Sequence, residues 1–249
     1  MCCFSGNVKS VSDTSIFCRM GAQGNQVVIY SMALETERDV AMILPIPIQE
    51  NRDEESVEFI NLKLAPKLFE KLDRAFPAIL PRGGTLGATF GDEPKSAALE
   101  VQSVGSFAAS FVPRIRDFDR LDRQFRIESS VWESLPQYQD HGFVVFKLKA
   151  GKQKVHPMAF AYPARDREQI VFPTVHIHDG KVHAEAEFDH ALYCQSESGE
   201  VRMNWQESVA LAGGYVNEAT TRGTIRIDEH VYKKTIQGLH ENEDLVVPS

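Results

Sequence analysis

Residues 172–194, FPTVHIHDGKVHAEAEFDHALYC, constrain the fold of this chain more than any other stretch. The pair Asp179-Gly180 at its centre favours a two-residue turn, because a type I′ turn needs positive φ at both positions. On either side of this turn polar and apolar residues alternate, as they do in an antiparallel ribbon with one face on the core. The sequence therefore predicts a β-hairpin over this stretch.

This hairpin would gather histidines on its polar face. With a two-residue turn, His176 lies opposite His183, and His178 follows on the same face. Opposite Cβ atoms in a hairpin are about 5 Å apart, so three imidazoles could share one metal ion. Three neutral imidazoles leave an open coordination position, as catalytic metal sites do. Glu185 lies on the same face, where it would orient a ligand or act as a base. The alternative is an ordinary solvated face.

The N-terminus adds two thiols, Cys2 and Cys3. Removal of Met1 would give Cys2 a free α-amine with a pKa of about 8, next to a thiol with a pKa of about 8.5. Both cysteines could join the imidazoles as soft ligands, and sulfur ligands favour copper over zinc or iron. Alternatively, Cys2 would act as a catalytic nucleophile that uses its own amine as the base.

The composition excludes several classes of protein. The net charge of −8 argues against a nucleic-acid partner and against binding to an anionic membrane, because both need a basic surface. No apolar run approaches the roughly 20 residues that span a bilayer. The N-terminus lacks a charged region followed by an apolar one, so we expect a cytoplasmic protein. The four cysteines lack the spacing of a disulfide framework.

The rest of the chain indicates an α+β fold that is predominantly antiparallel β-sheet, sandwich- or barrel-like, with a few short helices. We expect a single β-rich domain over residues 1–240 and a flexible tail at 241–249. A glycine-rich surface loop is predicted at 81–94, and a hairpin around Gly151. Strands are predicted at 14–19, 25–34, 39–48, 57–64, 143–149 and 155–162, and helices at 66–76, 115–125 and 230–239.

Parts of the chain resemble a known family. The segments MCCF, VVIYSMALETERDVAMILPIPI, VEFINL, KLFEKLD and HGFVVFKLKAGKQKVHPMAFAYP are similar to the uncharacterised bacterial family DUF2330. The resemblance covers about the first two-thirds of the chain and implies no activity, and the chain lacks the signal peptide of that family. His176-Ile177-His178 followed by Glu185 is also similar to the H-x-H…E motif of cupins. However, the glutamate comes too late for that motif, and the later cupin module is not evident.

Three functions follow from these observations. The first is a metal-binding protein, a copper-dependent oxidoreductase acting on a small molecule, with Cys2, Cys3, His176, His178 and His183 as ligands. The second is an amidohydrolase with Cys2 as nucleophile, although such enzymes usually pack two sheets between helical layers and this chain is poor in helices. The third is a non-catalytic β-rich binding protein. The sequence predicts no oligomeric state.

Overall fold

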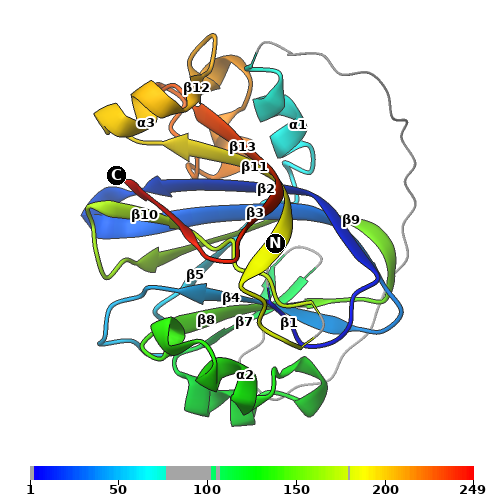
Figure 1. Ribbon diagram of the computed structural model, residues 1–249. Coiled ribbons are helices and arrows are strands. Elements are labelled where there is room, and N and C mark those ends of the chain that lie inside the picture. Colours follow the sequence, from blue (N-terminus) through cyan, green and yellow to red (C-terminus); the bar gives the residue numbers. More distant parts are fainter. Residues whose placement is uncertain (1–2, 77–101, 105–106, 179) are drawn as a thin grey trace.

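The computed structural model describes residues 3–76, 102–104, 107–178 and 180–249. Two stacked β-sheets form a sandwich, and short helices cover its outer faces (Figure 1). The prediction of a largely antiparallel β-fold with a few short helices is therefore confirmed. The glycine-rich stretch 81–94 lies outside the described residues.

The smaller sheet has five strands in the order β1-β4-β8-β7-β6. Its strands are β1 (Cys3–Phe4), β4 (Val40–Ile46), β6 (Gln102–Val104), β7 (Phe107–Val112) and β8 (Gly142–Leu148).

The larger sheet has seven strands in the order β12-β13-β11-β2-β3-β9-β5. Its strands are β2 (Ser10–Met20), β3 (Asn25–Thr36), β5 (Glu58–Asn61), β9 (Gly151–Pro163), β11 (Glu185–Gln195), β12 (Gln206–Glu207) and β13 (Tyr232–Glu241). A separate pair joins β10 (Gln169–Phe172) to β14 (Leu245–Pro248). Residues of this pair, such as Ile170 and Phe172, belong to the core between the sheets.

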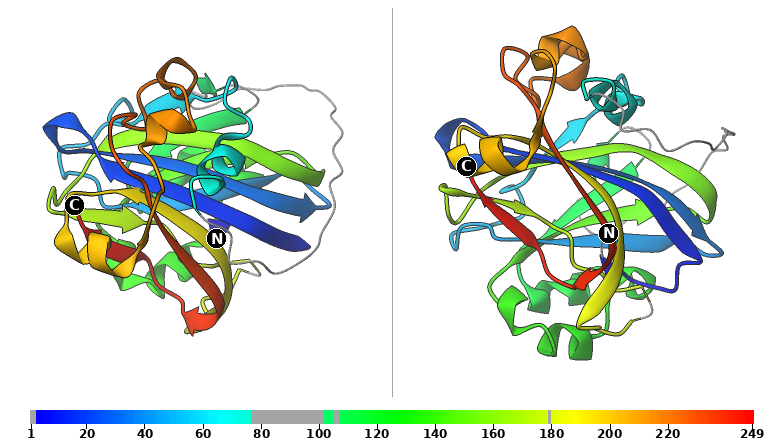
Figure 2. Two further views of the ribbon diagram at one scale, coloured as in Figure 1. Left: turned by 90° about the horizontal axis from the view of Figure 1, so that it is seen from above. Right: turned by 45° about the horizontal axis from the view of Figure 1, so that its top comes forward.

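Three apolar clusters hold the layers together. The largest lies between the two sheets and includes Tyr30, Phe146 and Phe160. The second packs the outer face of the five-stranded sheet against a helical layer, where Trp132 contacts Phe143. The third covers the outer face of the seven-stranded sheet with α1 and residues 212–231. Figure 2 shows these helical segments on opposite sides of the sandwich.

The helices are short. The α-helices are α1 (Leu68–Asp73), α2 (Ser129–Glu133), α3 (Gly199–Asn204) and α4 (Glu218–Thr221), and the 3-10 helices are η1 (Ala22–Gly24), η2 (Ile115–Arg120), η3 (Arg123–Phe125), η4 (Pro136–Tyr138) and η5 (Ala212–Gly214). The predicted helix at 115–125 is the pair η2 and η3. Its apolar residues Phe118, Leu121 and Phe125 are buried, as their spacing predicts.

The predicted hairpin around Gly151 is wrong in its pairing. Both strands exist, but β8 pairs with β4 and β7, whereas β9 pairs with β3 and β5 in the other sheet. The chain crosses between the sheets here, as it does between β3 and β4. Ala150 N–H donates to Asp39 Oδ1 over 2.8 Å and ties the two crossings together. A strand apolar on both faces, such as β8, belongs inside a layered structure and not in a solvated hairpin.

The C-terminal region also differs from its prediction. Residues 230–239, predicted as a helix, contribute most of β13, which pairs with β11 along all of its ten residues. Residues 241–249, for which we expect a flexible tail, contain β14, which pairs with β10. Pairing with a strand that is distant in sequence thus overrides the local helical pattern. No helix in the described part of the chain is long and apolar enough to cross a membrane.

Candidate functional site

The predicted hairpin over residues 172–194 does not form. Residues 173–184 connect β10 to β11 without a named strand, and β11 pairs with β2 in parallel and with β13 in antiparallel orientation. In the connection, Ile177 makes one isolated bridge, with Cys3. His176 and His183 are therefore not opposite residues of a hairpin.

Two side chains near the C-terminus replace the missing strand partner. The Asn242 side-chain oxygen accepts from His176 N–H over 2.6 Å, and its amide nitrogen donates to the carbonyls of His176 and His183, both over 2.9 Å. Asp244 Oδ1 accepts from the N–H groups of Thr174 and Val175 over 2.8 and 3.0 Å. These bonds satisfy buried backbone groups that would otherwise require a second strand.

The N-terminal strand occupies the other side of this connection. Cys3 pairs with Ile43 of β4, and Phe4 N–H donates to Ile177 O over 2.9 Å. The Cys3 side chain is fully buried in the apolar cluster that covers the five-stranded sheet. Cys3 is thus a core residue and not an exposed ligand. Cys2, the other predicted ligand and the predicted nucleophile, lies outside the described residues.

The three predicted histidine ligands differ in their surroundings. His176 is buried, and its ring lies nearly parallel to the rings of His178 and His190, with centroid distances of 5.5 and 5.3 Å. Phe188 packs against His176 with ring centroids 4.3 Å apart. His183, in contrast, is exposed. The third ring of the cluster is therefore His190 of β11, which the hairpin register did not place with the others.

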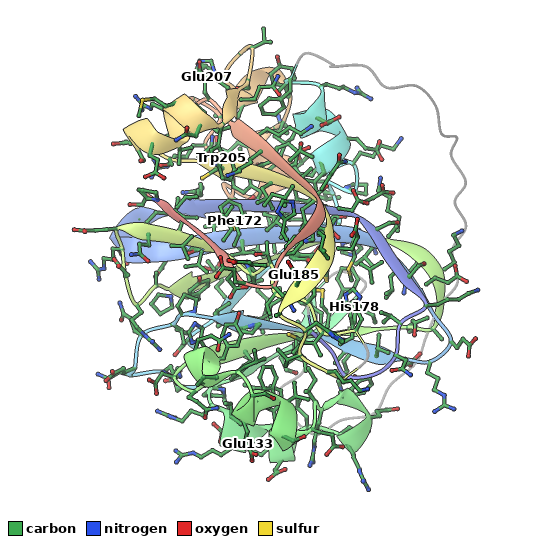
Figure 3. The ribbon with its side chains drawn as sticks, in the orientation of Figure 1. Glu133, Phe172, His178, Glu185, Trp205 and Glu207 are labelled. Carbon is green, nitrogen blue, oxygen red and sulfur yellow. The ribbon has the colours of Figure 1, made fainter. Side chains whose placement is uncertain are left out.

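A hollow of about 330 Å³ does bring the predicted residues to one surface. His176 and His178 line its inner side, and the exposed His183 and Glu185 line its outer side. Figure 3 shows His178 and Glu185 where β11 begins. Glu185 is exposed and pairs across the strands with Glu241. Its neighbour across the strands thus carries a like charge.

Burial controls the protonation of this region. It lowers the pKa of His176 to about 2 and the pKa of His190 well below its ordinary value, so both rings are neutral at pH 7. It also raises the pKa of Asp244 to about 6. The Tyr138 hydroxyl donates to Asp244 Oδ2 over 2.9 Å, and burial raises the pKa of this tyrosine as well.

This geometry does not suit a metal ion. The His176 and His178 ring centroids are 5.5 Å apart, and the ring planes are 16° apart. Among the described residues, no group of three or more His, Cys, Asp or Glu side chains could hold a metal ion. The predicted ligand set is therefore not assembled from Cys3, His176, His178 and His183.

Comparison with known proteins identifies the fold. No family model matches the chain, and no curated protein does either. Among solved structures, baculovirus P35 aligns with a TM-score of 0.52 and 14% identity over 100% of this chain and 99% of P35. A mutated baculovirus P35 after caspase cleavage aligns with a TM-score of 0.50 and 13% identity over 96% of this chain and 99% of that one. P35 in the caspase-8/P35 complex aligns with a TM-score of 0.49 and 13% identity over 96% of this chain and 96% of that one.

The chain thus has a P35-like fold from end to end, and two predictions are corrected. The metalloenzyme hypothesis, with its copper-dependent oxidoreductase activity, is wrong, because the fold is that of P35 and the described residues form no metal site. The prediction of a small-molecule partner is corrected as well: P35, to which this fold is similar, has been solved in complex with a protein, caspase-8. A non-catalytic binding protein, the third hypothesis, fits the findings better.

Proposed function

We propose that this chain is a non-catalytic protein that binds and inhibits a cysteine protease of the caspase class. The observation that carries the proposal is the P35-like fold, which extends over 100% of this chain and 99% of P35. A mutated P35 has been crystallised after caspase cleavage, so a caspase cuts that protein. A cytoplasmic location is part of this proposal.

The described residues favour binding over catalysis. Cys3, Cys18 and Cys194 are all buried, and burial raises the pKa of Cys18 and Cys194 above the ordinary value for a thiol. A thiol that is buried and stays protonated is a poor nucleophile, because the thiolate is the reactive form. The neutral His176 and His190 rings are likewise enclosed by packing. These groups stabilise the fold, and the protease would supply the nucleophile.

The sequence indicates where a protease would cut. Residues 77–101 lie outside the described residues and connect α1, on the outer face of the seven-stranded sheet, to β6, at the edge of the other sheet. Caspases hydrolyse the peptide bond that follows an aspartate. Asp92 is the single aspartate in this segment. From the sequence alone, we propose that the protease would cut the bond between Asp92 and Glu93.

The test is a titration of active caspase-8 with the purified full chain, followed by hydrolysis of a fluorogenic peptide. We expect activity to fall in proportion to the added chain, and intact-mass analysis to show two fragments divided after Asp92. The variant Asp92→Ala should lose inhibition, whereas the exposed Asp166→Ala should keep it. Full caspase activity at excess chain, across a panel of caspases, would refute the proposal. Inhibition that survives in Asp92→Ala would refute only the assigned bond.

A further inference from the structure

The strand β13 leaves much of one edge unpaired. It pairs with β11 along its whole length, but on its other side β12 covers only Tyr232 and Lys233. Figure 2 shows β13, in dark orange-red, along the outside of the yellow β11. From residue 234 to residue 241, no strand among the described residues pairs with this edge. An open edge of this length can accept another strand.

The alternation of hydrogen bonds between β13 and β11 shows which backbone groups of β13 face away from β11. One step beyond the Glu185–Glu241 pair, Asn242 N–H donates to Ala184 O over 2.9 Å. Even-numbered residues of β13 therefore direct their backbone groups toward β11, and odd-numbered ones toward the open side. On that side Ser208 N–H donates to the carbonyl of an odd-numbered residue, Val231, over 2.9 Å, which agrees with this alternation. The outward residues beyond β12 are Thr235, Gln237, Leu239 and Glu241, all with exposed side chains.

These outward groups have few partners in the described structure. The ring of His240 donates to Gln237 O over 2.9 Å, and Glu243 N–H donates to Glu241 O over 3.1 Å. The outward N–H groups and the carbonyls of Thr235 and Leu239 have no hydrogen bond to a described residue. The Leu239 side chain is 63% exposed, which adds an apolar contact surface to the edge.

We propose that a second copy of this chain pairs with β13 in antiparallel orientation about a two-fold axis. A two-fold interface must be complementary to itself. After its first residue, Tyr232, the strand carries Lys233, which forms an ion pair with Asp73, and Lys234. It ends with Glu241, and Glu243 follows. An antiparallel copy places the basic start of one strand near the acidic end of the other, whereas a parallel copy would bring like charges together.

The outward residues determine the register of this pairing. Thr235 pairs with Glu241 of the second copy, and Gln237 pairs with Leu239 of the second copy. The axis then passes between the two Gly238 residues, which form a pair without direct hydrogen bonds and with Cα atoms about 4.5 Å apart. Glycine has no side chain to obstruct this approach. β12 limits the paired segment at the start, and the turn at Glu243 limits it at the end.

The experiment measures mass against concentration by light scattering and sedimentation velocity on the full chain. We expect a monomer–dimer equilibrium that strengthens at low salt. Gln237→Pro removes an outward N–H without touching the β11 ladder and should abolish the dimer, whereas Gln237→Ala keeps that N–H and should preserve it. Glu241→Lys should weaken the dimer at low salt without altering the backbone. Circular dichroism establishes that each variant is folded.

Hydrogen exchange supplies the second measurement. The amides of Thr235 and Leu239 should exchange more slowly as the protein concentration rises. A monomer at every concentration would overturn the proposal, and would indicate that the positive φ of Gly238 (86°) twists the edge away from partners. A dimer that survives both Gln237→Pro and Glu241→Lys, with no added protection of these amides, would overturn it as well.

Discussion

Two stretches of this chain carry similar sequence patterns and fold differently. Residues 14–34 contain two apolar-rich segments around the turn 21–25, and they form the antiparallel pair β2 and β3. Residues 172–194 contain a clearer alternation around Asp179-Gly180, and they do not form a hairpin. The strand β2 pairs with its sequence neighbour, whereas β11 pairs with β2 and β13, both distant in sequence. Alternation therefore does not name the strand partner, and in the second stretch it does not report burial either, because Thr174, Val175, His176 and Ile177 are all buried.

The second stretch also shows what can substitute for a partner. Its backbone N–H groups donate to the side chains of Asn242 and Asp244, which lie 66 and 69 positions later in the chain. A side-chain amide or carboxylate can bond to backbone groups in the same way as an opposing strand does. The following predictions test whether these side chains hold residues 173–178, and they begin with the largest expected effect.

Removal of the Asp244 carboxylate should have the largest effect. Asp244 accepts three hydrogen bonds, from the N–H groups of Thr174 and Val175 and from the Tyr138 hydroxyl. Asp244→Ala leaves these buried donors without an acceptor, so we expect a loss of about 3–5 kcal/mol in the free energy of unfolding. Asp244→Asn keeps one acceptor oxygen and should lose about 1–2 kcal/mol. Urea denaturation measures both, and equal small losses would show that the connection does not depend on this residue.

Part of this fold and of the histidine cluster could be predicted from the sequence. The strands β2, β3, β4, β8 and β9 and the apolar face of η2 and η3 were predictable, because their periodicity reflects burial. The pairing of β8 and β9 in different sheets was not, because an apolar run does not specify which neighbours cover it. The histidine cluster was predicted in part. His176 and His178 do lie together, but His190 replaces His183 because the connection is not a hairpin.

Acid should destabilise the protein through His176. In a solvated hairpin this ring would titrate normally, but burial lowers its pKa to about 2. The unfolded chain binds a proton below pH 6.5 and the folded chain does not, so stability is complete above pH 6.5 and falls as the pH is lowered. At pH 4 this amounts to about 3 kcal/mol for His176.

Protonation of Asp244 changes the stability in the opposite direction, so the measurement needs a variant in which this carboxyl group is replaced. Its pKa of about 6 lies above the unfolded value, so protonation between pH 6 and pH 4 favours the folded state. The free energy of unfolding should therefore be measured against pH in the Asp244→Asn background, with and without His176→Phe. We expect a shallower acid slope in the double variant. Equal slopes would mean that His176 is accessible to protons in the folded state.

Gln26 forms a similar link on the first stretch. Its side-chain nitrogen donates to Val171 O over 2.6 Å, and its oxygen accepts from Val171 N–H over 3.0 Å, so β3 is bonded to β10. Gln26→Leu fills a similar volume but leaves Val171 N–H without its acceptor and Val171 O with only the Cys18 thiol at 3.7 Å, so we expect a loss of about 1–3 kcal/mol. Gln49→Leu is the control, because Gln49 makes a single longer bond of 3.3 Å to Ala164 O. Losses of the same size in both variants would argue against the link.

The smallest effect is expected at His183, which the hairpin pattern treats as equivalent to His176. His183 is exposed, and the bond that reaches it from Asn242 uses its backbone carbonyl and not its ring. His183→Ala should therefore change the free energy of unfolding by less than about 0.5 kcal/mol, as is usual for surface substitutions. His176→Ala removes a ring that packs on three others and should cost about 1–3 kcal/mol. Equal losses at the two positions would restore the hairpin as the better description of this stretch, because only a hairpin gives both imidazoles the same surroundings.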